Sequence, residues 1–453
     1  MTETTLPIRP ARPVLRHDSF TGGSFIQSHQ QYKPSSATWS QNFNDVVNSP
    51  PQLLNDNPIT PDPSKVKDSG IVHSIFAGQS TSSLPADTPR LVATIFYKTS
   101  NPVHPNLHPT PAVPPGSAPS LDIDKLPREP PAPEPEPLDH LYGPYVSQLC
   151  LTQFLQILES LNTPYQQIHS SHRCLDKEDQ PRVVEVTFWP PPNPEYLSFE
   201  ELSKHESIWR FEREWNVEVV LQRESVYRRY KRLAVFDMDS TLIQQEVIDE
   251  IAKFIGVEKE VSEITTRAMN GELDFSESLK ARVSLLKGVP ADVFEKLKST
   301  ITISPGAREL CRALKRLGYT MAVLSGGFQP LAEWLAGELG LDYAYANHLE
   351  TDPSTQTLTG TLSPTHPIIN ASEKRHLLQT LASKHGIPIS QTLAVGDGAN
   401  DLLMLKAAGL GVAWRAKSKV QLEAPCRLNG ESLVDLLFLM GVSGGEGREL
   451  IDV

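Results

Sequence analysis

The sequence predicts an α/β protein in which a parallel sheet with a helical cap follows a smaller α+β unit and an N-terminal arm. Two observations favour this fold class. From residue 231 onward, short apolar strands alternate with amphipathic helices, which is typical of a Rossmann-like parallel sheet. Between residues 89 and 230 the order is strand, helix, strand, strand, helix, strand, the ferredoxin-like pattern. The 453 residues leave room for roughly two to four domains.

Composition excludes several classes of protein. Asp and Glu number 54 against 42 Lys and Arg, for a net charge of −12, so we expect no nucleic-acid partner. No apolar run approaches the ~18 residues of a membrane span, so we expect no membrane partner. Four separated cysteines without a Cys-x-x-Cys pair argue against a disulfide scaffold. They favour a reducing, cytoplasmic location, as does an N-terminus that lacks the apolar core of a secretory signal.

Two proline-rich stretches are predicted to lack regular structure. Residues 1–88 are rich in Ser, Thr, Pro, Asn and Gln without a sustained apolar period, and we interpret them as a disordered, low-complexity arm. Residues 101–140 form a proline-rich insertion that favours extended backbone, so a spacer is the first interpretation. A docking site for a proline-reading domain is the alternative.

The unit at residues 89–230 is built around this insertion. Its predicted strands and helices are, in order, a strand at 91–98, a helix at 145–161, strands at 165–169 and 183–189, a helix at 197–215 and a strand at 217–222. The basic run at residues 228–232 that follows predicts a solvated hinge between domains. Because ferredoxin-like units often pair edge to edge, a homodimer through this unit stays open.

The unit at residues 231–453 carries the parallel sheet. Its predicted strands lie at 233–236, 320–324, 393–395 and 410–413, and its predicted helices at 306–317, 330–339, 374–385 and 401–408. Residues 245–300 read as helical throughout and are too long for a simple crossover, so they predict a cap above the sheet edge. Residues 347–360 predict a polar hairpin.

Polar residues collect where these strands end, which is where open α/β sheets bind ligands. Asp237 and Asp239 follow the first strand, and Ser325 and Gly326 follow the second. The third strand leads into the Gly-Asp-Gly-Ala-Asn-Asp loop of residues 396–401. Each motif alone is ordinary turn or capping chemistry. Together they supply a carboxylate nucleophile, hard oxygen ligands for Mg²⁺ and donors for phosphate oxygens, the requirements of phosphoryl transfer.

Lys374, at the start of a predicted helix, completes this set, although a lone lysine is more often a solvated charge. The combination resembles the haloacid dehalogenase-like superfamily of aspartate-nucleophile phosphatases. Residues 237–241, 325–326 and 396–401 are similar to its first, second and fourth motifs, and Lys374 to its third. The resemblance covers roughly residues 231–440 and is closest to the phosphoserine phosphatase family. The preceding unit is more loosely similar to an ACT-type domain.

The resemblance implies a role for each motif residue. Asp237 would be the nucleophile and Asp239 the general acid and base, with an aspartyl-phosphate between the two steps. Mg²⁺ would bind Asp237, Asp397 and the main-chain carbonyl of Asp239. Phosphate would contact Ser325, Gly326, Lys374 and Asn400, and Asp401 would support its neighbours.

The cap would recognise the rest of the substrate, O-phospho-L-serine, whose cleavage is the last step of L-serine biosynthesis. Arg282 can bind a carboxylate bidentately, and Glu246 can pair with an ammonium group. Phe275 lies two helical turns from Arg282 on the same face, and Met269 belongs to the same resemblance. The alternative is that Met269 and Phe275 are cap core while Glu246 and Arg282 form a surface ion pair.

Two other functions remain open on the sequence. One is a phosphatase for another small phosphomonoester or a phosphoprotein, which a cap without a paired acid and arginine would favour. The other is a noncatalytic amino-acid sensor built on the ferredoxin-like unit, against which the intact acidic and lysine motifs count.

Overall fold

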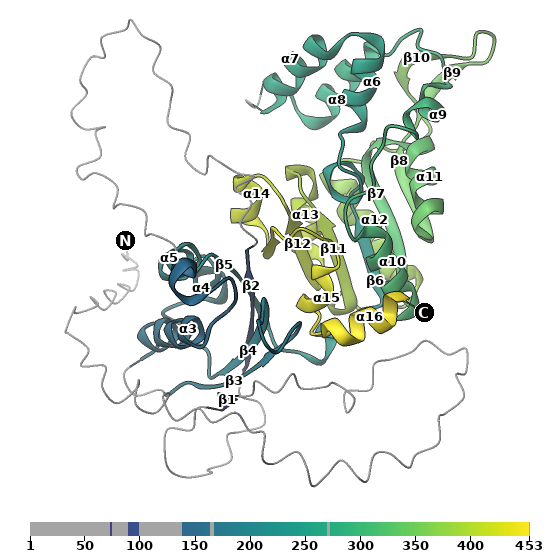
Figure 1. Ribbon diagram of the computed structural model, residues 1–453. Coiled ribbons are helices and arrows are strands. Elements are labelled where there is room, and N and C mark those ends of the chain that lie inside the picture. Colours follow the sequence, from purple (N-terminus) through teal and green to yellow (C-terminus); the bar gives the residue numbers. More distant parts are fainter. Residues whose placement is uncertain (1–72, 75–88, 99–137, 164–166, 270–271, 453) are drawn as a thin grey trace, which may run out of the picture.

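The computed structural model describes residues 73–74, 89–98, 138–163, 167–269 and 272–452. Except for the two-residue strand β1 (His73–Ser74) and residues 138–140, the predicted arm and proline-rich insertion lie outside the described residues. Figure 1 shows an antiparallel sheet at one end of the molecule and the cap helices at the other, with a parallel sheet between them. Within the described part, no helix is long and apolar enough to cross a membrane.

The antiparallel sheet has the strand order β1-β3-β4-β2-β5. Its further elements are β2 (Leu91–Tyr97), α2 (Asp139–Tyr142), α3 (Gln148–Ser160), β3 (His169–Cys174), β4 (Val183–Trp189), α4 (Phe199–Ser203), α5 (Glu206–Glu214) and β5 (Val217–Arg223). Helices α3 and α5 pack on one face through a core that includes Phe154, Phe188 and Phe211. Apart from the split second helix, the predicted order of elements, with α3 and α4–α5 as the two helices, is confirmed.

Two predictions in this unit are wrong in detail. Strand β3 begins at His169, where the prediction ended, because its sequence His-Ser-Ser-His-Arg-Cys is polar and has little β-branched content. The single helix predicted at 197–215 is two helices. The chain turns at His205, whose ring nitrogen accepts a hydrogen bond from Ser207 N–H and begins α5.

The parallel sheet has the order β13-β12-β11-β6-β7-β8. Its strands are β6 (Leu233–Phe236), β7 (Thr320–Phe328), β8 (Tyr343–Asn347), β11 (Thr392–Gly396), β12 (Leu410–Trp414) and β13 (Cys426–Leu428). The sequence did not predict the two edge strands, β8 and β13, because β8 alternates Tyr with Ala without β-branched residues and β13 has three residues. Strand β6 lies between β11 and β7, so the three strands that lead into the predicted polar motifs are neighbours in the sheet. The motifs therefore lie together at one edge of the sheet.

Helices cover both faces of this sheet and extend beyond β13. They are α10 (Ala307–Arg316), α11 (Gln329–Leu339), α12 (Ala371–Lys384), α13 (Leu402–Ala407), α14 (Ser418–Glu423), α15 (Asp435–Leu439) and α16 (Gly444–Asp452). The predicted hairpin is β9 (Leu349–Asp352) and β10 (Thr357–Leu362), which pair antiparallel.

The cap consists of α6 (Val247–Ile255), α7 (Glu258–Met269), α8 (Phe275–Ser284) and α9 (Val293–Leu297). Two chain segments connect it to the sheet, and they pair with each other: Ile243 bridges Ile303, and Gln244 N–H donates to Thr302 C=O over 2.9 Å. The cap therefore rests on a short two-stranded stalk.

The predicted solvated hinge at residues 228–232 is wrong for two of its cations. The side chain of Arg228 is only 8% exposed and pairs with Glu185 over 2.7 Å. Burial raises the pKa of Glu185, but Arg228 and Arg173 outweigh it and hold that pKa below its usual value. Lys231 is buried and donates to Ser390 C=O over 2.7 Å. A cation beside a carboxylate can be buried, and the sequence run alone does not reveal its partner.

Arg228 belongs to a contact between the antiparallel unit and the end of α15. Three side chains of the antiparallel unit donate to carbonyls at the end of α15: Gln222 to Leu439 over 2.9 Å, Arg173 to Gly441 over 3.0 Å and Arg228 to Phe438 over 3.4 Å. On the same side, Phe96, Leu175, Val183 and Val220 join the apolar core of the parallel-sheet unit. The outer face of the antiparallel sheet is thus covered by the end of the chain.

Candidate active site

The turn after β6 places two carboxyl groups at the edge of the sheet. Asp237 N–H still pairs with Val395 C=O of the neighbouring strand, and its Oδ1 accepts a hydrogen bond from Met238 N–H. Ser240 adopts φ +54°, in the left-handed region, so the chain reverses sharply after Asp239. Asp239 Oδ1 is buried and has no hydrogen-bond partner among the described residues. Burying a carboxylate oxygen without a partner costs free energy unless a hydrogen-bond donor or a cation binds to it.

Lys374 is the cation at the centre of the site, and its side chain is fully buried. Its Nζ lies 2.7 Å from Asp237 Oδ1 and 2.7 Å from Asp401 Oδ1. Burial alone lowers the pKa of a lysine, but Asp237 and Asp401 outweigh it and raise the pKa of Lys374. The residue is therefore a permanent ammonium group beside Asp237, and the interpretation as a solvated charge is wrong.

The loop after β11 brings two more carboxyl groups to the same place. Asp397 Oδ1 accepts a hydrogen bond from the buried Thr241 hydroxyl over 3.0 Å. Asp401 Oδ2 accepts one from Gly398 N–H over 3.0 Å. Oxygens of Asp237, Asp397 and Asp401 lie within 4.8 Å of one another.

The carboxyl groups outnumber the cation. Burial and the neighbouring Asp401 raise the pKa of Asp397 to about 7. Burial and then Asp401 raise the pKa of Asp237, and burial and then Glu246 raise that of Asp239. Four carboxyl groups around one ammonium group leave an excess of negative charge that a bound cation would relieve. Because every donor is oxygen, the set fits a hard dication such as Mg²⁺.

The turn at Ser325 and Gly326 is the meeting point of sheet and cap. A Cβ built on Gly326 would lie 3.2 Å from the Phe275 ring of α8 and 3.7 Å from Asn400 Nδ2. A Cβ on Gly327 would lie 3.0 Å from Met238 Cε and 3.2 Å from Asp239 Oδ2. Only glycine leaves this space free, so a small anionic group can approach the backbone there.

The cap contributes two opposite charges above this space. Ser240 Oγ donates to Glu246 Oε1 over 3.0 Å, which holds Glu246 toward the turn after β6. The half-buried Arg282 has a pKa lowered by burial, with Glu246, Asp249 and Asp239 as the nearby acids that oppose this. Within the described ranges, no carboxylate oxygen lies within 4.0 Å of its guanidinium, so the alternative of a Glu246–Arg282 ion pair is not observed.

Met269 is the last residue of α7, and its side chain lies outside the described part of the chain. The structure thus brings together residues from all four motifs and from the cap, namely Asp237, Asp239, Glu246, Phe275, Arg282, Ser325, Gly326, Lys374, Asp397, Asn400 and Asp401.

Asn347 contacts the site but was not predicted from the sequence. Asn347, 1% exposed at the end of β8, donates from Nδ2 to Gly326 C=O over 2.8 Å. Its Oδ1 accepts from Ile369 N–H over 2.9 Å, just before α12 and Lys374. It therefore joins the Gly326 turn to the segment that leads to Lys374. No signal in the sequence distinguishes Asn347, because it is the first residue of the polar stretch that predicts a hairpin, where asparagine is common.

The fold and this constellation define a class of enzyme. The haloacid dehalogenase-like hydrolase family matches residues 231–409. A hydrolase of that family from Salmonella enterica superposes with a TM-score of 0.54 at 26% identity, covering 78% of this chain and 98% of its own. Residues 231–453 are only about half of the chain, so this similarity extends into the antiparallel unit.

Curated relatives narrow the class. A probable phosphoserine phosphatase of Schizosaccharomyces pombe is 47% identical over 237 residues, which are 52% of this chain and 79% of the relative. The phosphoserine phosphatase of Saccharomyces cerevisiae is 44% identical over 232 residues, 51% of this chain and 74% of the relative. The chain belongs to the phosphoserine phosphatase family of haloacid dehalogenase-like hydrolases, and it is a phosphatase.

Proposed function

We propose that the enzyme hydrolyses O-phospho-L-serine to L-serine and phosphate, as the last step of L-serine biosynthesis. The observation that carries the proposal is the buried Asp237–Lys374 pair, 2.7 Å apart, beneath a cap that presents Glu246 and Arg282. The relatives named above support the same substrate.

The chemistry divides between the two acids of the first motif. Asp237, held by Lys374 and Met238 N–H, attacks phosphorus and forms an aspartyl-phosphate. Asp239 has a raised pKa because of burial and Glu246, so it can carry the proton that the serine oxygen takes as it leaves. In the second step Asp239 removes a proton from the water that hydrolyses the intermediate. Ser325, the Gly326 N–H, Lys374 and Asn400 receive the phosphate oxygens.

The proposed metal is Mg²⁺, held by Asp237, Asp397 and the main-chain carbonyl of Asp239. Asp401 belongs to the same cluster, but its two oxygens already accept bonds from Lys374 and Gly398 N–H, so its role is to orient these groups. When bound, the cation would neutralise the charge between phosphate and nucleophile. Asp397 is suited to this role because Thr241 fixes one oxygen and leaves the other free.

The cap supplies the specificity in this proposal. Arg282 binds the α-carboxylate of phosphoserine, and Glu246 binds the α-ammonium group. Phe275, close above Gly326, shields the site from bulk water when the cap is closed, and Met269 is proposed to contact the substrate beside it.

The remaining assignments are also proposals. The chain is divided into an arm (1–88), a ferredoxin-like, ACT-type unit (89–230) and the phosphatase unit (231–453). For the second unit, the support is the strand order β3-β4-β2-β5 with two helices on one face. A homodimer would form through this unit. The four cysteines are buried free thiols, which supports a cytoplasmic location.

The direct test measures phosphate release from L-phosphoserine with Mg²⁺, after EDTA, and after Mg²⁺ is added back. We expect activity to fall by at least about 10²-fold with EDTA and to return with excess Mg²⁺, because the carboxylate cluster then repels the phosphate. O-phosphothreonine and p-nitrophenyl phosphate serve as comparison substrates. Activity that EDTA does not change would contradict the metal assignment, and a preference for p-nitrophenyl phosphate would contradict the substrate.

Replacing Arg282 by alanine tests the specificity separately. We expect kcat/KM for L-phosphoserine to fall by about 10²-fold, because a charge-assisted bidentate pair is lost, and that for p-nitrophenyl phosphate by less than about threefold. The matched control is Arg267→Ala on the same cap, whose side chain is 56% exposed and pairs with Glu272. Equal losses on both substrates in Arg282→Ala would show that Arg282 does not recognise the carboxylate.

A further inference from the structure

The β9–β10 hairpin lies outside the cap in sequence but is attached to it in space. Gly288 N–H donates to Leu358 C=O and Leu358 N–H to Val289 C=O, each over 2.8 Å, and Ala291 N–H donates to Gln356 C=O over 2.9 Å. Pro290 and Thr357 form an antiparallel bridge at the same place. The start of β10 therefore pairs, in the manner of a strand, with residues 288–291. These residues lie shortly after α8, the helix that carries Arg282.

Side-chain packing strengthens this attachment. Leu358 is 2% exposed and lies in the same apolar core as Leu279, Val283 and Leu286 of the cap. Two of these residues, Leu279 and Val283, lie on α8 and flank Arg282. A shift of the hairpin would thus move or loosen the helix that presents the guanidinium.

One glycine permits the close approach. Gly360 has φ +81°, and a Cβ there would lie 3.2 Å from Ser284 C=O and 3.0 Å from Lys287 Cβ. Ser284 is the last residue of α8, so the hairpin backbone lies directly against the end of that helix. Any side chain at position 360 would push the two apart.

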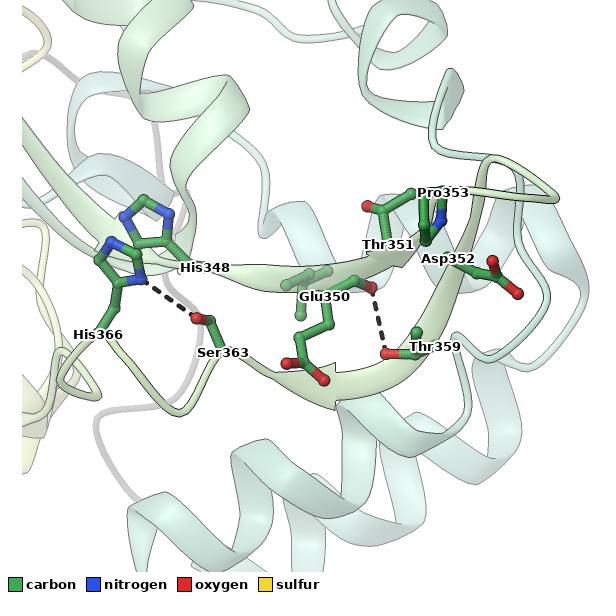
Figure 2. A pocket seen from close by; sticks show the side chains of 9 residues that line it. His348, Glu350, Thr351, Asp352, Pro353, Thr359, Ser363 and His366 are labelled. Atoms are coloured by element: carbon green, nitrogen blue, oxygen red, sulfur yellow. Dashed lines mark hydrogen bonds between the residues drawn. The ribbon is translucent and has the colours of Figure 1, made fainter.

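The other end of the hairpin is fixed to the phosphate side of the site. Asn347, just before β9, donates to Gly326 C=O, and Ser363 N–H closes the base of the hairpin on His348 C=O over 2.8 Å. Figure 2 shows His348 and His366 stacked across this base, with His366 bonded to Ser363; the two ring centres are 3.7 Å apart. The pocket drawn there contains none of the site residues and runs along the hairpin from His348 and His366 to Asp352 and Pro353, so it is a feature of the hairpin itself.

We propose that the β9–β10 hairpin is a positioning element for Arg282, and that Gly360 is the residue which seats it against α8. The hairpin would hold the carboxylate-binding helix at a fixed distance from the Gly326 turn, to which Asn347 ties its base. This inference deepens the proposed function and rests on it. It predicts that damage to the hairpin harms recognition of the substrate's carboxylate and spares the chemistry at phosphorus.

The test compares Gly360→Ala with Gly256→Ala. Gly256 ends α6 on the same cap at φ +76°, with no atom within 4 Å of a built Cβ, so it shares the backbone strain without the contact. For Gly360→Ala we expect KM for L-phosphoserine to rise roughly tenfold, with kcat for p-nitrophenyl phosphate within about twofold. Gly256→Ala should leave both within about twofold.

A double variant separates positioning from general damage. If the hairpin acts through Arg282, adding Gly360→Ala to Arg282→Ala should lower kcat/KM for L-phosphoserine by less than about twofold further. A further tenfold loss, equal losses on both substrates, or an equal effect of Gly256→Ala would overturn the inference. Leu358→Val, which trims the buried contact by one methylene group, replaces Gly360→Ala if that variant does not fold. Wild-type enzyme inactive on L-phosphoserine would instead refute the proposed function.

Discussion

Asp237→Asn is expected to lower phosphate release from L-phosphoserine by at least about 10³-fold, because an amide cannot form the acyl-phosphate. The same variant should form no acid-stable, alkali-labile phosphoenzyme when the reaction is quenched. The fold should persist, since asparagine has the same shape and Lys374 keeps its contact with Asp401. Thermal unfolding should occur at an equal or higher temperature, because one of several mutually repelling carboxyl groups is gone.

Asp292→Asn is the matched control for this change. The Asp292 side chain is 57% exposed and pairs with Lys296 on the cap surface. A surface ion pair contributes little, so activity should stay within about twofold of wild type. If Asp237→Asn retained wild-type activity, Asp237 would not be the nucleophile.

Lys374→Met is expected to have the second large effect, on activity and on stability together. Removing the only cation within 4.0 Å of Asp237 among the described residues leaves two buried carboxylates without compensation, which costs about 3–5 kcal/mol. Phosphate release should fall by about 10³-fold. The nucleophile loses the charge that orients it, and the phosphate loses a counterion.

The pH dependence of this destabilisation follows from linkage. Without Lys374 the pKa of Asp237, already raised by burial and by Asp401, would rise further above its value in the unfolded chain. A raised carboxyl pKa means that folding binds protons, so stability falls as the pH rises. The melting temperature of Lys374→Met should therefore be lowered more at pH 8 than at pH 5. Lys406→Met, which breaks a surface pair with Glu423, should show no such difference, and an equal deficit at both pH values would contradict the buried-charge account.

Much of the fold could be predicted because its strands are short apolar runs between clear turns. Strands β4 and β6 begin and end at the predicted residues. Strand β3 was misplaced because its residues are polar, and the edge strands β8 and β13 were not predicted because β8 alternates Tyr with Ala and β13 has only three residues. The burial of Arg228 could not be predicted because it depends on Glu185 and on a carbonyl more than 200 residues away.

The candidate site could be predicted in outline because phosphoryl transfer requires particular residue types at strand ends. The sequence could not reveal that Lys374 bridges Asp237 and Asp401, or that Thr241 fixes Asp397, because these contacts depend on the fold. Asn347 and Gly360 could not be found at all, since asparagine and glycine in a hairpin are normally explained by the turn itself.

Shortening the chain to the parallel-sheet unit would remove three side chains that donate hydrogen bonds to carbonyls at the end of α15. They are Gln222, Arg173 and Arg228. A fragment that started at β6 would lack these three side-chain donors, although Phe438 C=O would keep its bond from Gly441 N–H over 2.9 Å, and it would expose Phe438, which now packs edge-on against Phe96. Such a fragment would need its last helices redesigned with polar side chains before it could be expected to stay dissolved and folded. The antiparallel unit is thus part of the surroundings that keep α15 folded, and a shortened chain would have to replace it.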